Sequence, residues 1–255
     1  MPQKTEPLGL YVHIPFCASK CGYCDFYSIT NRAGRHAYTD TLVQEILSYQ
    51  GRGYTADTLF LGGGTPSLME AEELVRILSA CREAFSLDME GEITLEANPD
   101  SVSLGYLREL RQAGFNRVSF GAQSIVDREL KALGRRHDAA RIRQAMEWAK
   151  EAGFARRSLD VMVGIPYQTS ASLSRTLEEF AGMGPDHISA YLLKIEEGTP
   201  FARQNAQRLC PDEDKTADLY LQTVEQLASL GYAQYEISNF AKPGGQSRHN
   251  LKYWH

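Results

Sequence analysis

The fold is decided by residues 8–24, which have the sequence LGLYVHIPFCASKCGYC. The first seven residues alternate in character, as expected of a strand that is buried on one face. One face carries Leu8, Leu10, Val12 and Ile14, and the other carries Tyr11 and His13. Pro15 ends the strand, and three cysteines follow in the next loop. The sequence therefore predicts a loop of thiols at the carboxyl end of a strand.

The rest of the chain alternates short apolar runs with amphipathic stretches, which is typical of βα units in a parallel sheet. Strands are expected at residues 58–61, 92–97, 117–120, 158–163, 187–193 and near 234–237. Helices are expected at residues 38–49, 71–85, 139–152 and 212–230. Such units predict an α/β fold, a (β/α)6-type partial barrel with a curved parallel sheet. Functional groups should then lie at the carboxyl edge of the sheet.

The charge balance and the hydrophobic pattern exclude several classes of protein. The chain has 255 residues and a formal net charge of −5. It has no basic block, so nucleic acid is excluded as the main partner. No apolar run is long enough to cross a bilayer, and the polar start at residues 1–8 has no apolar signal core. We therefore expect a cytoplasmic protein whose contact with a membrane is at most peripheral.

Five cysteines, an odd number, make a poor disulfide framework. Cys17, Cys21 and Cys24 are crowded behind the first strand, and crowded thiolates are typical metal ligands. Three thiolates leave one iron of a 4Fe–4S cluster open, whereas a structural zinc ion needs a fourth ligand such as His13 or His36. The residues alone leave both sites open. The remaining cysteines, expected to be ordinary thiols, are Cys81 and Cys210.

A glycine loop and three polar residues follow later strands. The loop at residues 62–64 is Gly-Gly-Gly, and glycine lets a backbone approach a ligand closely. Glu96, Gln123 and Asp160 come at or near the ends of later predicted strands. A buried carboxylate is costly without a partner, so these residues either line a pocket or form structural salt bridges. The candidate partners for salt bridges are Arg117 and Arg135.

The spacing Cys-x3-Cys-x2-Cys resembles the signature of the radical S-adenosylmethionine (SAM) superfamily. In that superfamily three cysteines bind a 4Fe–4S cluster and SAM occupies the open iron. Further motifs extend the resemblance over essentially the whole chain, to the oxygen-independent coproporphyrinogen III oxidase family. These motifs lie at residues 9–17, 62–66, 96–99, 119–124 and 249–254.

The resemblance implies roles for individual positions, none of them catalytic. Cys17, Cys21 and Cys24 match the cluster ligands. The positions that match contacts to the cluster-bound SAM are Tyr11, Gly63 and Glu96. The positions that match contacts to a second SAM in the oxidase are Tyr23, Gly64, Thr65, Gln123, Arg135, Asp160 and Lys194.

One position departs from the oxidase pattern. Phe26 stands where the oxidases have a further cysteine, and a phenyl ring cannot carry thiol chemistry. The run Cys24-Asp25-Phe26 and the motif at residues 249–254 instead resemble the sister branch of haem chaperones. In that branch the second motif is associated with haem, and imidazole suits haem iron, so His249 is a candidate axial ligand. The alternative is that this motif makes a structural contact to a further domain.

The resemblance implies a radical SAM core at residues 1–240 and the start of a connection at residues 241–255. Family members continue into a C-terminal domain, so we expect the chain to be truncated. The implied function is that of a haem chaperone, with coproporphyrinogen III oxidase as the alternative. A radical SAM enzyme that acts on RNA ranks third, because the sequence lacks a basic surface. The implied partners are haem or porphyrin, a haem-acceptor protein and a reductant such as flavodoxin or ferredoxin.

Overall fold

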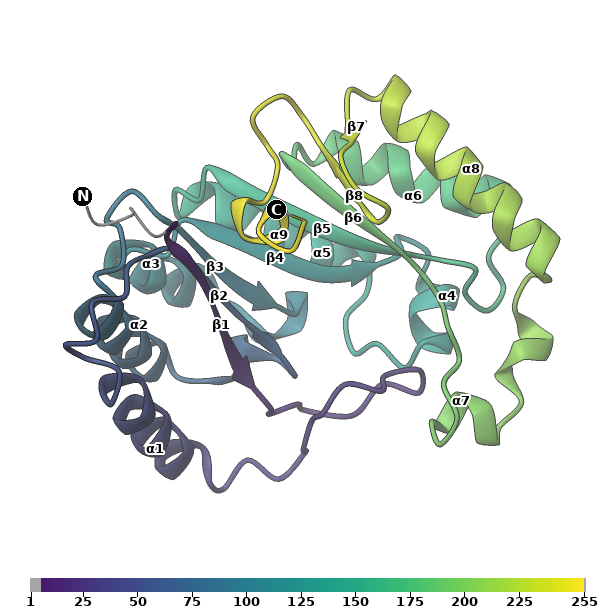
Figure 1. Ribbon diagram of the computed structural model, residues 1–255. Helices are drawn as coiled ribbons and strands as arrows, with labels where there is room; N and C mark the ends of the chain where they lie inside the picture. The colour runs from purple at the N-terminus through teal and green to yellow at the C-terminus, as the bar shows by residue number, and fades with distance from the viewer. Residues whose placement is uncertain (1–5, 255) are drawn as a thin grey trace.

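The computed structural model describes residues 6–254, which form a curved sheet with helices packed on its outer face (Figure 1). Most of the expected polar start, residues 1–5, lies outside the described residues. The strands are β1 (Leu8–Ile14), β2 (Ala56–Gly63), β3 (Glu92–Ala97), β4 (Arg117–Gln123), β5 (Arg156–Val163), β6 (His187–Leu192), β7 (Ala233–Gln234) and β8 (Asn239–Ala241). The helices are α1 (Arg35–Leu47), α2 (Ala71–Phe85), α3 (Leu104–Ala113), α4 (Asp127–Ala132), α5 (Ala139–Glu151), α6 (Ser170–Gly182), α7 (Pro200–Arg203), α8 (Glu213–Ser229) and α9 (Arg248–Leu251).

The strands stand in the order β1-β2-β3-β4-β5-β6-β8-β7. Strands β1 to β6 are parallel and follow the chain order, as expected of consecutive βα units. The sheet curves without closing, which confirms the predicted partial barrel. Every βα loop therefore opens at one edge of the sheet, where the cysteine loop also lies.

The two faces of the sheet differ in chemistry because side chains alternate along each strand. The outer face is apolar and packs against the helices; Leu59, Leu95 and Val118 on it are fully buried. The inner face carries mostly polar groups, among them Glu96 and Ser119, which are partners in the β3–β4 register. The polar inner face leaves room for a ligand, whereas the outer face holds the fold together.

Several predicted elements have the expected bounds, and others differ for identifiable reasons. The strands at 8–14 and 92–97 and the helix at 71–85 are confirmed. The first helix begins earlier than expected because Arg35 and His36 contact the segment around α2, at Leu68 and Glu73. Strand β2 does not stop at the glycines, since Gly62 and Gly63 still pair with β1.

The strand expected near residues 234–237 is shorter than predicted, since β7 covers only Ala233–Gln234, and it does not extend the parallel sheet. Strand β8 pairs antiparallel with β6, and β7 forms a hairpin with β8 at the edge of the sheet. The residues between them turn, with the Ser238 N–H donating to the Glu236 carboxylate at 2.9 Å. A tight turn reverses the chain here, whereas a parallel strand would need a crossover helix.

The segment after β8 folds back across the concave side of the sheet, where α9 lies close to the start of β2 (Figure 1). The Glu92 carboxylate on β3 anchors it by accepting hydrogen bonds from the Ser247 hydroxyl and from the backbone N–H groups of Arg248 and His249. The expected boundary after residue 240 falls inside β8, and residues 247–251 pack on the sheet. None of the helices within residues 6–254 is long and apolar enough to span a membrane.

Candidate functional site

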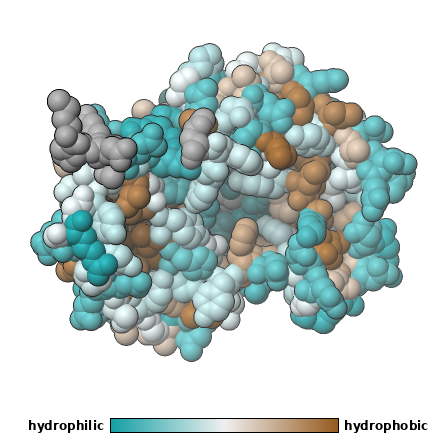
Figure 2. Space-filling model, viewed as in Figure 1, coloured by the Kyte–Doolittle hydropathy of each residue, from teal (hydrophilic) through white to brown (hydrophobic). Residues whose placement is uncertain are grey.

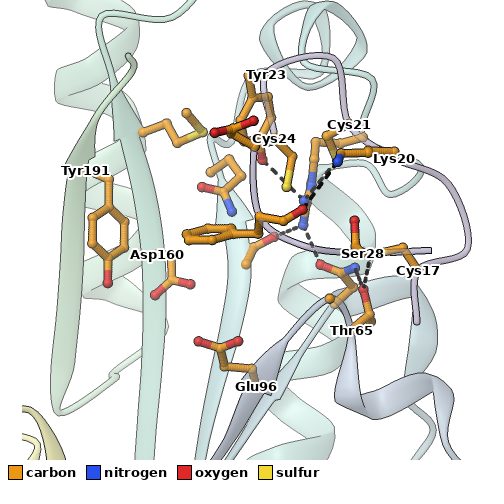
Figure 3. A pocket seen from close by; sticks show the side chains of 18 of the residues that line it. Cys17, Lys20, Cys21, Tyr23, Cys24, Ser28, Thr65, Glu96, Asp160 and Tyr191 are labelled. Atoms are coloured by element: carbon orange, nitrogen blue, oxygen red, sulfur yellow. Dashed lines mark hydrogen bonds between the residues drawn. The ribbon is translucent and has the colours of Figure 1, made fainter. Parts of the chain in front are cut away.

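A cavity of about 590 Å³ opens where β1 to β6 end. Figure 2 shows a hollow in the middle of this face of the molecule, surrounded mostly by hydrophilic surface. Figure 3 shows Glu96, Asp160 and Tyr191 on the strand side, facing the loop that carries the three cysteines. The predicted site residues that line the cavity are Cys17, Cys21, Tyr23, Cys24, Gly63, Gly64, Thr65, Glu96, Gln123, Arg135, Asp160 and Lys194.

The cysteine loop is closed at its base by backbone hydrogen bonds. The Cys17 N–H donates to the Ile29 carbonyl at 2.9 Å, and the Ile29 N–H donates to the Pro15 carbonyl at 2.8 Å. A short bridge between Phe16 and Ile29 lies between these bonds. The loop therefore leaves and re-enters the sheet edge at one place, so its thiols are held beside the cavity.

The three thiols border the cavity from different positions. The Cys17 Sγ lies 3.6 Å from the Thr65 hydroxyl, and the Arg135 guanidinium donates to the Cys21 Sγ at 3.6 Å. Burial raises the pKa of the Cys24 thiol. Within residues 6–254, no three His, Cys, Asp or Glu side chains converge closely enough to hold one metal ion. A 4Fe–4S cluster needs a different arrangement, since each thiolate binds a different iron.

The zinc alternative gains no support from the two histidines that were candidate fourth ligands. His13 is engaged through both ring nitrogens, with the Tyr11 hydroxyl at 3.1 Å and the Tyr27 carbonyl at 2.9 Å. His36 pairs with Glu73 on α2 at 2.7 Å. Neither histidine is among the residues that line the cavity.

The other two cysteines lie apart from the cavity. Cys81 is 1% exposed within α2, and burial raises its pKa to about 12. Cys210 follows a short 3-10 turn at Ala206–Leu209, and burial raises its pKa too. Both thiols are held in their protonated, unreactive forms.

Arg135 connects the cysteine loop to the strand ends. Its guanidinium donates to the Asn98 side chain at 2.5 Å, to the Gly121 carbonyl and to the Tyr23 hydroxyl at 3.4 Å. Asn98 in turn donates to the Thr65 hydroxyl at 3.2 Å. Arg135 therefore links the loops after β1, β2, β3 and β4, in part through Asn98, and these hydrogen bonds connect the parts of the cavity wall.

The glycine loop comes so close to its neighbours that side chains would not fit. A Cβ at Gly64 would lie 2.8 Å from the Phe16 carbonyl oxygen. Gly63 has a φ of 115°, a conformation that side chains disfavour. Its N–H donates to the Glu96 carboxylate at 3.2 Å. Glycine is thus required both for the close approach of two loops and for the direction of this N–H group.

Glu96 and Asp160 lie at the floor of the cavity, where both are partly buried. Burial, and then the charge of Asp160, raises the pKa of Glu96 to about 8. Burial raises the pKa of Asp160 to about 6, although Arg117 and a hydrogen bond from Ser119 act in the opposite direction. Neither carboxylate forms an ion pair with Arg117 or Arg135 among the described residues, so the salt-bridge alternative is not supported. Buried carboxylates without a cationic partner are typical of a site that binds a cation.

Three predicted site residues are placed differently from those that line the interior of the cavity. Tyr11 does not line the cavity, but burial, and then the charge of Glu96, raises its pKa to about 12. Lys194 reaches the rim, where its ammonium pairs with Glu196 at 2.6 Å and is largely exposed. His249 lies away from the cavity, near the amino end of β2, with its Nδ1 2.9 Å from the Thr58 hydroxyl.

Asn98 and Tyr191 also border the cavity, although neither was expected there from the sequence. Asn98 follows β3 within the motif at residues 96–99, so its position after a strand was a usable signal. Tyr191 has the appearance of an ordinary aromatic strand residue, and only the inward direction of its side chain reveals it.

The chain is similar to known proteins over nearly its full length. The model of the radical SAM superfamily matches residues 11–180. The haem chaperone HemW of Escherichia coli strain K12 is 37% identical over 256 residues, covering 98% of this chain and 67% of that protein. HemW of Mycobacterium tuberculosis strain H37Rv is 37% identical over 261 residues, covering 99% of this chain and 67% of that protein.

Solved structures show the same fold. The coproporphyrinogen III oxidase HemN from Escherichia coli, described as a radical SAM enzyme, superimposes with a TM-score of 0.83 at 32% identity. The match covers 93% of this chain and 56% of that one. The chain therefore spans about two thirds of the HemW proteins and little more than half of HemN.

Proposed function

The chain belongs to the radical SAM superfamily and, within it, to the HemW family, and from this premise we propose that it is a haem chaperone. Membership in the superfamily implies a 4Fe–4S cluster and SAM. The observation that carries the proposal is the combination of a cavity suited to both cofactors with Phe26 in its wall. The phenyl ring is 71% exposed and stands where the oxidase family has a thiol.

The cavity fits a cluster because three reduced thiols border it from one tethered loop. Cys17, Cys21 and Cys24 would each hold one iron. When bound, the reduced cluster supplies an electron to SAM. The chain's own part is to keep the thiols together, through the closure at Ile29 and the contact from Arg135.

The floor of the cavity fits the positive groups of SAM, which are an ammonium and a sulfonium. Glu96 and Asp160 offer carboxylate oxygens there, and the backbone at Gly63 lies beside them. The surrounding burial excludes water and strengthens these interactions. The chain thus binds and orients SAM with groups from β2, β3 and β5.

Haem ligation by His249 requires a rearrangement. The imidazole is 3% exposed, its Nδ1 contacts Thr58, and its Nε2 lies 3.3 Å from the Tyr253 hydroxyl. Burial lowers the pKa of His249 to about 4, so the neutral ring has the lone pair that iron needs. Tyr253 is exposed, and its movement would uncover Nε2. Haem would therefore compete with Tyr253 for the same nitrogen.

The wider setting belongs to the same proposal. Haem or porphyrin would be the cargo, an acceptor protein would receive it, and a flavodoxin or ferredoxin would reduce the cluster. Free thiols at the cluster loop suit a reducing compartment, so we place the chain in the cytoplasm with at most peripheral membrane contact.

The test uses the 255-residue chain reconstituted with iron and sulfide under anaerobic conditions. It is incubated with SAM and a reductant, together with either haem or coproporphyrinogen III. We expect stoichiometric haem binding in the absorption spectrum and no decarboxylated porphyrin by chromatography. Haem affinity should fall in His249→Ala and rise in Tyr253→Phe, which frees Nε2.

Two results would contradict the proposal. Catalytic decarboxylation of coproporphyrinogen III, with formation of 5′-deoxyadenosine, would favour the oxidase. Unchanged haem affinity in both the His249 and the Tyr253 variants would remove His249 as the ligand, while leaving the cluster and SAM sites untouched.

A further inference from the structure

Two acidic side chains meet at the floor of the cavity on either side of β4. Glu96 comes from β3 and Asp160 from β5, and Ser119 of β4 lies between them. Ser119 donates to the Asp160 Oδ1 at 3.2 Å, and the Gly63 N–H donates to the Glu96 Oε2 at 3.2 Å. Figure 3 shows both carboxylates pointing into the cavity. Asp160 has a further hydrogen bond from Ser189, and neither carboxylate has an ion-pair partner among residues 6–254, so both can still accept from a cationic ligand.

Two buried carboxylates this close repel each other when both are ionised. The pKa of Glu96 rises to about 8, because of burial first and Asp160 second. The pKa of Asp160 rises to about 6, because of burial. A positive charge nearby is needed if the pair is to be anionic near neutral pH.

Arg117 is the cation beneath this pair. It lies two residues before Ser119 on β4, so it points to the same inner face one layer deeper. It is 2% exposed, and its Nε has no hydrogen-bond partner among residues 6–254. No carboxylate in that part of the chain is close enough to form an ion pair with it. Its charge nevertheless lowers the pKa of both Glu96 and Asp160.

The other nearby cation has a different task. Arg135 also lowers the pKa of Asp160, but its donors are engaged by Asn98, Gly121, Tyr23 and Cys21 at the side of the cavity. A bonded ion pair would occupy carboxylate oxygens, whereas Arg117 supplies charge through space and leaves them free. The titratable and charged groups that face the acidic pair are Tyr11 of β1, Arg117 of β4, His187 and Tyr191 of β6, Arg135 after α4 and, from farther below, Glu92 of β3 and His249 of α9.

We propose that Arg117 is a positioning residue that sets the charge of the SAM pocket from below. Its guanidinium, which forms no ion pair with either carboxylate, favours the ionised forms of Glu96 and Asp160 without taking their oxygens, so the pair can give up its proton as the ammonium and sulfonium groups of SAM enter. This inference rests on the proposed binding of SAM in this cavity. Arg117, which lies outside the cavity wall, would then control how the affinity for SAM depends on pH.

The test is calorimetric titration of the reconstituted protein with SAM between pH 6.5 and pH 9.5. Arg117→Gln should weaken SAM binding about tenfold at pH 7 and approach the wild-type affinity at pH 9.5, since one pKa unit corresponds to a factor of ten. Arg117→Lys keeps the charge and should retain a wild-type profile. Arg108→Gln, which removes a surface cation paired with Glu151, is the matched control and should change nothing.

The pH dependence distinguishes an effect of the Arg117 charge from an effect of its packing. A loss in Arg117→Gln that is equal at every pH, or no loss at any pH, would overturn the inference. If the glutamine variant does not hold a cluster, Arg117→Lys decides the matter: a wild-type dependence of SAM affinity on pH supports the role of the charge, and a displaced pH midpoint overturns the inference. A wild-type protein that holds its cluster but binds no SAM would refute the proposed function instead.

Discussion

At the scale of single residues, the thiols proposed as cluster ligands differ from the other thiols in their position and burial. Cys17, Cys21 and Cys24 border one cavity on a tethered loop, whereas Cys81 is enclosed in the core by α2. A thiol can bind iron only if it can lose its proton and reach the metal. The surroundings of Cys17, Cys21 and Cys24 therefore suit the ligand role that we propose for them, and those of Cys81 do not.

We expect Cys17→Ala, Cys21→Ala and Cys24→Ala each to lose the 4Fe–4S cluster, because each removes the ligand of one iron. Iron and sulfide analysis and the EPR spectrum of the reduced cluster measure this after anaerobic reconstitution. Cys210→Ala is the matched control and should keep the full cluster. Full cluster content in any of the first three variants would show that its thiol is not a ligand.

Glu96 makes the stability of the cofactor-free protein depend on pH. Its pKa of about 8 in the folded protein lies above the ordinary value of 4.5, so the folded state keeps a proton that the unfolded state has released. Stability from this group is therefore present below pH 4.5 and is lost as the pH rises towards 8.

Glu96→Gln removes that loss and retains an acceptor for the Gly63 N–H. We expect the variant to match the wild type at pH 4.5 and to exceed its unfolding free energy by about 1–3 kcal/mol at pH 8. Urea unfolding under reducing conditions measures both values. Equal stability of the two proteins at pH 8 would mean that Glu96 is not held protonated.

At the scale of elements, the helices on the outer face end in different ways. Helix α2 ends at Ser86, which has a φ of 44°, and α3 ends at Gly114, which has a φ of 116°. Only glycine adopts such angles without steric cost. The end of α2 therefore stores strain that the end of α3 avoids.

We expect Ser86→Gly to raise the unfolding free energy by about 0.5 kcal/mol, because it relieves the left-handed conformation. Gly114→Ala is the opposite control; it should destabilise the protein, since the new Cβ would also collide with the Arg82 side chain. Thermal unfolding measures both changes. A lower Tm in Ser86→Gly would indicate that the Ser86 side chain contributes more than its backbone costs.

At the scale of the whole molecule, one carboxylate joins the end of the described chain to its middle. Glu92 is 4% exposed, accepts three hydrogen bonds from residues 247–249, and lies 3.7 Å from the Arg156 guanidinium. These contacts place α9 against the inner face of the sheet. The position of His249 thus depends on a residue far away in the sequence.

Glu92→Ala should release this segment and lower the unfolding free energy by about 3 kcal/mol, because it leaves three donors without their acceptor, while Arg156 keeps its ion pair with Asp186. Hydrogen exchange of residues 247–254 should rise in parallel. The exposed neighbour Glu90→Ala is the control and should affect neither quantity. If residues 247–254 stayed protected in Glu92→Ala, their anchoring would have to come from other contacts, such as that between His249 and Thr58.

Much of the fold and of the site follows from local sequence. The alternation at residues 8–14 is visible in any window, and so are the spacing of the cysteines and the glycines after β2. The strand-end rule then places Glu96, Gln123 and Asp160 at one edge, as the structure confirms. Local patterns suffice here because consecutive βα units can assemble in essentially one way.

The sequence by itself determined the parallel half-barrel and the site of the thiols, since side-chain periodicity and right-handed crossovers are local properties. Only the tertiary structure decided the antiparallel end of the sheet, the burial of His249 beside Thr58, and the placement of Arg117 under two carboxylates. These features arise from contacts between residues that lie far apart in the sequence. Burial and charge act through space, so their effect on Glu96 and Asp160 exists only once the sheet has curved around them.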